Sequence, residues 1–271
     1  MLGKLFKHEF KNTGRILLPL NLILIGFTLL GMIMLGLNVF SNSYMGFAAV
    51  AMLVIYIFGI IALFIVTYVF LMVRFYRSMY SAEGYLTHTL PVSPLATLNT
   101  KLAVSTFWVF LSMVLCFGSV YALVATAIHT YTGEFNSADF FAGFEDALGI
   151  SAGTALAWAL LFMLLSSLSG ILMIYCSISI GQLFNKYKIL AAIVTYVIFY
   201  LILQVVNMII MVRSSISSAE EIPLVDNADQ SFLADFYGDG IGIPTMIQSV
   251  IMIVIFYAIT AYISKKRVNL D

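Results

Sequence analysis

Long apolar stretches alternate with shorter polar connections along the whole of this 271-residue chain. Crossing ~30 Å of hydrocarbon takes roughly 20 helical residues, and six stretches reach that length. We predict membrane-spanning helices at residues 16–37, 46–73, 102–128, 154–184, 189–212 and 245–264. The pattern indicates an all-α integral membrane protein that forms a single transmembrane domain over residues 1–271.

Composition supports this class of protein. Hydrophobic residues make up 62% of the chain and charged residues only 10%, whereas about 25% charged residues is usual for soluble domains. A basic start followed by an apolar run is also typical of a signal peptide. The run from Ile16 to about Leu37 exceeds the ~7–15 apolar residues of such a peptide, so we interpret it as the first span.

Basic and acidic residues occupy different connections. Twelve of the 13 Lys and Arg residues lie before the first span, within 74–101, between the fourth and fifth spans, or after the last span. Ten of the 13 Asp and Glu residues lie in 129–153 and 213–244. Because short cytoplasmic loops retain Lys and Arg, we expect both termini in the cytoplasm and the two acidic loops outside the cell. Arg213 is the exception, at the outer end of the fifth span, where its long side chain can reach the interface.

The first 15 residues are amphipathic at helical spacing. The apolar face holds Leu2, Leu5, Phe6 and Phe10, and the basic face holds Lys4, Lys7 and Lys11. Such a helix lies in the membrane surface with its lysines towards anionic headgroups. Pro19 is expected to mark the bend from this surface helix into the first span. The alternative is an ordinary basic flank of that span.

The cytoplasmic connection 74–101 reads as helix, short bend and helix. The second span can continue as helix until Gly84, which suits the position after a helix end. Pro91 biases the residue before it to extended geometry, and Ser93 and Pro94 form an N-cap and first-turn pair for the third helix. The connection carries Tyr76, Tyr80, Glu83, Tyr85 and His88.

The sequence contains no recognisable catalytic or metal-binding motif. No phosphate-binding G-x-x-x-x-G-K-[ST] motif and no H-E-x-x-H pair occurs, so we expect no enzymatic activity, no cofactor and no metal in this chain. Cys116 and Cys176 lie in apolar runs and are interpreted as packing residues. No ionisable side chain falls in the middle of a span, which disfavours an ion-coupled carrier. No nucleic-acid partner is expected.

Small residues recur on the fourth span at a spacing that allows helices to approach closely. The two pairs are Ser166 with Gly170 and Ser177 with Gly181. Each is a small-xxx-small pair, the pattern that membrane helices use for close packing. Whether the neighbouring helix comes from the same chain or a second copy is left open.

The stretch Tyr80–Val92, YSAEGYLTHTLPV, resembles a segment of the membrane subunits of ABC-2-type transporters in Gram-positive bacteria. The six-span outline and the amphipathic N-terminal helix are also similar. The resemblance implies that residues 1–15 are the family's elbow helix and that the 74–101 connection contacts a separate ATPase subunit. It implies further a pair of permeases, alike or different, in a bacterial plasma membrane, with ATP and Mg²⁺ bound by the ATPase.

Under this resemblance we expect ATP-driven export of an amphipathic substrate such as a peptide, drug or lipid. Tyr80, Glu83, Tyr85 and His88 are the candidate residues for coupling to the ATPase. The alternative for Glu83, Tyr85 and His88 is that they only cap and pack the bend. The long acidic connection 213–244 departs from the family, whose usual re-entrant helical pair we do not assume there.

Two other functions remain open from the sequence. One is a sensor or immunity protein that binds a cationic peptide at its acidic outer loops without transporting it. The other is a secondary carrier or channel that works without ATP.

Overall fold

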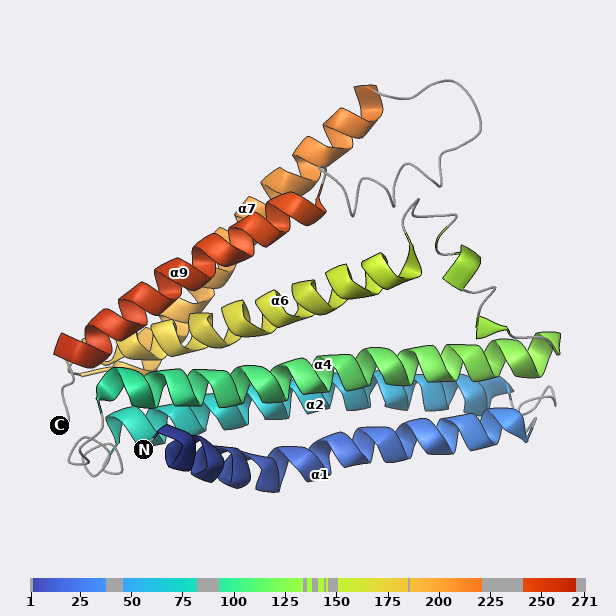
Figure 1. Cartoon of the computed structure of the whole chain (residues 1–271), viewed down its shortest axis with the longest axis horizontal. Helices are drawn as coiled ribbons and strands as arrows, with labels where there is room; N and C mark the ends of the chain where they lie inside the picture. The colour runs from blue at the N-terminus through green and yellow to red at the C-terminus, as the bar shows by residue number, and fades with distance from the viewer. Residues whose placement is uncertain are drawn as a thin grey trace. The chain divides into compact units, whose positions relative to one another are not determined.

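Six long α-helices make up most of the described chain in the computed structural model (Figure 1). The structure describes residues 2–37, 46–81, 93–133, 136–137, 141–143, 145, 151–184, 186–220 and 241–266. The helices are α1 (Leu2–Gly36), α2 (Gly46–Tyr80), α4 (Pro94–Thr132), α6 (Ala152–Gly181), α7 (Lys188–Glu220) and α9 (Gly242–Lys266). Each is long and apolar enough to cross a membrane, and no strand occurs among the residues described. The predicted all-α membrane fold with six spans is therefore confirmed.

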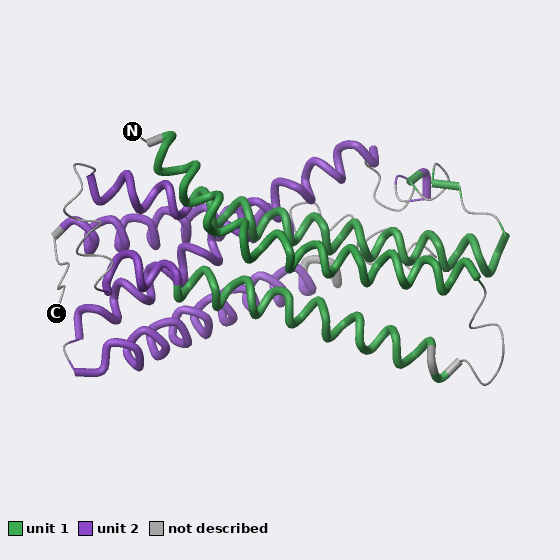
Figure 2. The backbone as a smooth tube through the Cα atoms, turned by 90° about the horizontal axis from the view of Figure 1, so that it is seen from below, with its two compact units in different colours: residues 1–73, 103–141 green, residues 74–102, 142–271 purple. Residues whose placement is uncertain are grey.

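The first helix is longer than the predicted first span. The predicted surface helix 1–15 is continuous with that span, because α1 runs unbroken from Leu2 to Gly36 with Pro19 inside it. A proline removes its own N–H bond, here to the carbonyl of Arg15, and its ring crowds that carbonyl, which bends the helix where the helix continues. Figure 2 shows the first turns of α1 at an angle to the rest of the helix.

The start of α4 follows the predicted capping pair. The Ser93 hydroxyl accepts a hydrogen bond from the Ala96 N–H at 3.3 Å, and Pro94 opens the helix. With 39 residues, α4 is about 58 Å long at 1.5 Å per residue, well beyond the hydrocarbon thickness. The helix begins at Pro94, eight residues before the predicted span 102–128, and its entry point into a membrane stays a prediction.

The chain divides into two compact units, coloured separately in Figure 2. Unit 1 comprises residues 1–73 and 103–141, and unit 2 comprises residues 74–102 and 142–271. The long helices α2 and α4 therefore contribute to both units. The segment assigned to unit 2 nearly coincides with the connection 74–101 that the sequence singles out.

Unit 1 joins α1 to the larger parts of α2 and α4. One face of α1 is buried at helical spacing, through Thr13, Leu17, Asn21, Leu24 and Thr28. Close approach is possible because glycines lie at the contact points: a Cβ on Gly14 would lie 2.9 Å from the Trp108 ring, and one on Gly31 would lie 2.8 Å from Leu123.

Unit 2 is built around α6, which packs extensively against both α7 and α9. Every residue from Ile171 to Ser179 on α6 is buried, so this part of the helix is covered on all sides. At the other end of α6, the Ser151 hydroxyl accepts from the Thr154 N–H, and a Glu145 carboxylate oxygen accepts from the Ala152 N–H at 2.8 Å. A negative charge at a helix N-terminus is favourable because the first N–H groups have no partner within the helix.

In contrast to α6, α7 is half-buried along the face that includes Ala192 and exposes apolar side chains over the rest of its surface. None of the most apolar window of this helix is buried inside the structure. A helix that is apolar on all faces is stable in hydrocarbon and not in water. A hydroxyl on this helix is satisfied within the helix itself. Thr195 donates to the Ala191 carbonyl one turn earlier at 2.8 Å, so the hydroxyl needs no partner outside.

Replacing Gly181 by alanine is expected to destabilise the protein. A Cβ at this position would lie 2.7 Å from the Ala192 Cβ and 2.8 Å from the Ala192 backbone, so α6 and α7 must separate. Overpacking of this kind costs about 1–3 kcal/mol, measurable as a lower free energy of unfolding in detergent. Gly26→Ala is the matched control, because nothing lies within 4 Å of its Cβ position. Equal stability of the two variants would contradict this packing.

Candidate functional site

The 74–102 segment is fastened to α6 by stacked aromatic rings. Phe75, near the end of α2, lies face to face with Tyr175 of α6, with ring centroids 3.7 Å apart and planes 8° from parallel. Both side chains are only 1% exposed. Aromatic pairs contribute beyond the area they bury, by about 0.5–1.5 kcal/mol, so this contact holds the end of α2 against the most buried part of α6.

A hydrogen bond one helical turn further on strengthens the same contact. The hydroxyl oxygens of Tyr80 and Ser179 are 2.8 Å apart. Since the Ser179 hydroxyl already donates to the Tyr175 carbonyl at 2.8 Å, the Tyr80 hydroxyl is the donor. We call the four residues Phe75, Tyr80, Tyr175 and Ser179 the α2–α6 clamp.

The other end of the connection is attached to α9. The Tyr257 hydroxyl donates to the Asn99 side-chain oxygen on α4 at 2.9 Å. Leu98 and Thr100, on either side of Asn99, are both buried. Both helix ends that flank residues 82–92 are thus anchored within unit 2, one on α6 and one on α9.

Of the four candidate coupling residues, the structure describes only Tyr80. Tyr80 is 5% exposed and bonded to Ser179, so its side chain holds α2 on α6 and presents no surface to a partner. Glu83, Tyr85 and His88 lie outside the described residues, and their coupling role stays a prediction. Tyr80 is the last residue of α2. Any docking surface formed by the residues after it would therefore follow a helix end that is fixed on α6.

The small residues of α6 lie in two different environments. Gly181 lies directly against Ala192 of α7, so its helix neighbour belongs to the same chain. Ser177 is 2% exposed and donates to the Met173 carbonyl at 2.8 Å. Ser166 and Gly170, by contrast, are only half-buried.

The lysines of the first turns are all solvent-accessible. Lys4, Lys7 and Lys11 are exposed, while Phe10 lies between the rings of Phe6 at 6.0 Å and Trp108 at 5.3 Å. The aromatic contacts fix the basic turns to α4. The arrangement is consistent with a basic face towards headgroups, which remains a prediction.

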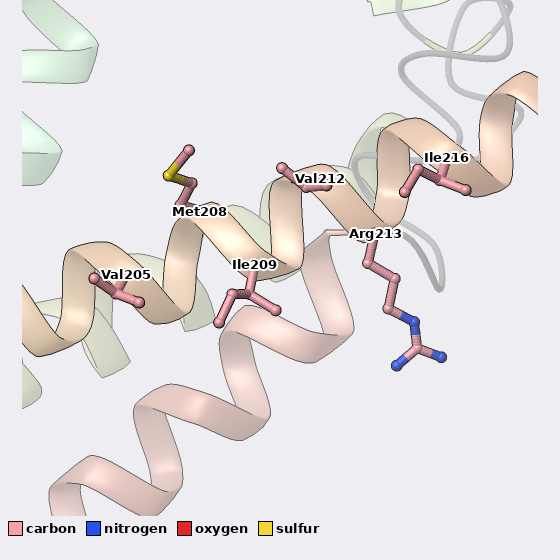
Figure 3. Close-up of a pocket in the computed structure, with 6 residues that line it drawn as sticks. All are labelled: Val205, Met208, Ile209, Val212, Arg213 and Ile216. Atoms are coloured by element: carbon pink, nitrogen blue, oxygen red, sulfur yellow. The ribbon is translucent and has the colours of Figure 1, made fainter.

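An open apolar groove follows α7 (Figure 3). Its lining residues are Val205, Met208, Ile209, Val212, Arg213 and Ile216. Figure 3 shows Arg213 extending away from the helix, the only charged group of the six. With five apolar side chains and one cation, this groove suits contact with lipid or another helix.

No group of three or more His, Cys, Asp or Glu residues that could hold a metal ion occurs in the described part of the chain. Cys116 and Cys176 are both free thiols, and Cys176 is fully buried.

Comparison with protein-family models, curated proteins and solved structures finds no match to this chain.

Sequence reasoning missed most of the clamp. Of its four residues only Tyr80 was a candidate, because Phe75, Tyr175 and Ser179 are ordinary span residues when read alone. A faint signal was present: Leu71, Phe75 and Met79 recur every four residues and are all buried, which marks one continuous face of α2. The residues of α6 that pack against this face lie a hundred residues further along the chain. Nothing in the sequence indicated that they would contact it.

Removing the clamp's hydroxyls is expected to lower stability non-additively. Tyr80→Phe and Ser179→Ala should each cost about 1 kcal/mol of unfolding free energy, the usual net contribution of one hydrogen bond. The double variant should cost little more than either single one, because both remove the same bond. Tyr76→Phe, at a half-buried tyrosine, is the control that should change little. Fully additive losses would show that the Tyr80–Ser179 bond contributes nothing.

Proposed function

We propose that this chain is the membrane subunit of an ABC-2-type transporter in a bacterial plasma membrane. It would form the path for ATP-driven export of an amphipathic substrate, together with a separate ATPase that binds ATP and Mg²⁺. The observation that carries the proposal is that residues 74–102 belong to the same compact unit as α6, α7 and α9. This is the connection for which the resemblance implies contact with the ATPase.

The clamp supports a mechanical role for this connection. A force on residues 82–92 would reach α6 through Phe75 and Tyr80, and α9 through Asn99. These contacts are short, and those to α6 are buried, so the helix ends that carry Phe75, Tyr80 and Asn99 would move together with the two spans. An ATPase that closes on ATP could therefore shift α6 and α9 without any energy source within this chain.

The proposed topology places both termini and the 74–102 segment in the cytoplasm. Six spans return the chain to the side on which it starts, and Lys and Arg concentrate at that side. A permease of this type works as a pair, and the second member would be another copy or a related chain. The apolar surface of α7 is available to lipid or to that second member.

The first test of the proposal is purification in mild detergent from the native membrane. A subunit with a phosphate-binding loop should accompany the chain, and the complex should hydrolyse ATP. Transport by the purified chain alone in liposomes, without ATP, would contradict the proposal and favour a secondary carrier. Binding of a cationic peptide without any flux would favour a sensor.

The Glu83→Lys variant tests the docking surface itself. Reversing this charge should reduce recovery of the ATPase several-fold, because a carboxylate at a contact surface is expected to pair with a basic partner. Glu221→Lys, in the acidic connection on the opposite side, is the control that should retain the ATPase. Unchanged recovery and transport with Glu83→Lys would contradict its assignment to the docking face.

The topology is tested separately with single introduced cysteines. Lys265→Cys, near the end of α9, should react with a membrane-impermeant thiol reagent only in inverted vesicles or opened cells. Glu134→Cys should react in intact cells. The native Cys116 and Cys176 should contribute little, since the first is half-buried and the second fully buried. Labelling of both positions from the same side would contradict the six-span topology.

A further inference from the structure

Four buried polar side chains in unit 1 leave part of their hydrogen-bonding capacity unused. They are Asn21 on α1, Thr67 on α2, and Trp108 and Ser112 on α4, and all are at most 4% exposed. The Asn21 Oδ1, Thr67 Oγ1, Trp108 Nε1 and Ser112 Oγ atoms have no hydrogen-bond partner among the described residues. Inside a membrane such groups are costly, because no bulk water can satisfy them.

Other buried hydroxyls in the same unit are satisfied within their own helix. Thr28 donates to the Leu24 carbonyl at 2.9 Å, and Thr13 donates to the Glu9 carbonyl at 2.8 Å. This bond to the preceding turn is the usual solution for Ser and Thr in a membrane helix. Thr67 and Ser112 do not use it, so they differ from the ordinary hydroxyls of this protein.

The four residues lie at nearly the same height along the helices. Gly14 lies against Trp108 and Gly31 against Leu123, so α1 runs parallel to α4, and Asn21 is level with α4 residues 113–115. The hydrogen bond between Tyr56 and Ser119 sets the register of α2, which runs antiparallel, and places Thr67 level with Trp108. Measured along the helix axes, all four therefore lie within about 10 Å of height, or seven residues at 1.5 Å each.

Helical periodicity places the four residues on facing surfaces. Asn21 is seven residues, or two turns, from Gly14, which touches Trp108. Ser112 is seven residues before Ser119, and Thr67 is eleven residues, or three turns, after Tyr56. These positions share the faces that α1, α2 and α4 turn towards one another.

Thr106 is also buried without a partner, but it does not belong to this group. It lies two residues before Trp108, and two residues correspond to about 200° around an α-helix. Its side chain is therefore on the opposite face of α4.

We propose that Asn21, Thr67, Trp108 and Ser112 form an intramembrane site for an uncharged hydrogen-bonding ligand. Trp108 offers an N–H donor, and Asn21 offers an acceptor because its Nδ2 already donates to the Leu17 carbonyl at 2.9 Å. The two hydroxyls can donate or accept. None of the four carries a charge, so the matching group is a neutral hydroxyl or amide and not an ion.

Two sources supply this chemistry: ordered water, which commonly satisfies buried polar groups, and the neutral polar part of an amphipathic molecule. The idea that this site lies on a substrate path rests on the proposed function. The idea that the site binds a ligand is independent of that function, and the experiments that test it need no ATPase.

Tryptophan fluorescence reports directly on the site, because Trp108 and Trp158 are the two tryptophans of the chain. In a Trp158→Phe background, reconstituted in nanodiscs, Trp108 should emit at longer wavelength than an indole in dry hydrocarbon. Its intensity should rise in D2O. Thr67→Val and Ser112→Ala should shift the emission to shorter wavelength and weaken the D2O effect.

Two control variants separate loss of the ligand from loss of the fold. Thr67→Ser keeps a hydroxyl and should keep the signal. Thr28→Val removes a hydroxyl that already has a partner and should leave Trp108 emission unchanged. If Thr28→Val alters the emission as much as Thr67→Val does, the effect is unspecific and the proposal is wrong.

Titration with octyl glucoside below its micelle concentration distinguishes the two sources. A D2O effect that octyl glucoside leaves unchanged identifies resident water. A saturable emission shift with octyl glucoside, absent with decane, identifies the hydroxyls of an amphiphile. Emission of dry indole that responds to neither D2O nor octyl glucoside overturns the proposal. So does a higher melting temperature of Thr67→Val and Ser112→Ala, which is the result expected of unpaired groups in a dry interior.

Discussion

Hydrocarbon offers no hydrogen-bond partner to a polar group, and this constraint governs the structure at every level. Backbone amides can be satisfied only within helices, which is why the described chain consists of long helices joined by shorter connections. The same constraint acts on side chains. Thr28 and Thr195 return their hydroxyls to a carbonyl one turn earlier, and Tyr56 and Tyr80 bond to serines of neighbouring helices.

The residues that break this rule are therefore informative. In unit 1, Asn21, Thr67, Trp108 and Ser112 are buried at similar height with unused hydrogen-bonding atoms. In unit 2, the hydroxyls of Tyr80 and Ser179 in the α2–α6 clamp are paired with each other. A paired hydroxyl contact also joins α2 to α4 in unit 1, through Tyr56 and Ser119, whereas the four unpaired groups are those that we propose for a ligand.

The clamp changes how the proposed coupling would work. The sequence suggests that the long second and third helices transmit movement, because both extend beyond the membrane. Under the proposal, α6 and α9 would receive the movement as well, since Phe75 stacks on Tyr175 and Asn99 accepts a bond from Tyr257. A connection anchored at both ends transmits a displacement that a loosely tethered loop would absorb.

Much of the fold was predictable because its causes are local. Six apolar runs of sufficient length dictated six helices, and Ser93 with Pro94 marked the start of α4. The continuity of α1 through Pro19 was not predicted, because a proline near a helix start can end a helix or merely bend it, and the choice depends on what packs around it. The close approach of α6 at Gly181 was anticipated as a small-residue contact, but its partner, Ala192, was not identified.

The sequence by itself determined the class of protein and the number of spans. These follow from transfer of apolar side chains into lipid and from local helix signals, both of which act residue by residue. Only the tertiary structure decided that Tyr80 is a buried anchor, that residues 74–102 belong with α6 and α9, and that four polar groups of unit 1 are buried without a partner. Each of these depends on contacts between residues far apart in the chain, which are set by the packing of whole helices and leave no local mark on the sequence.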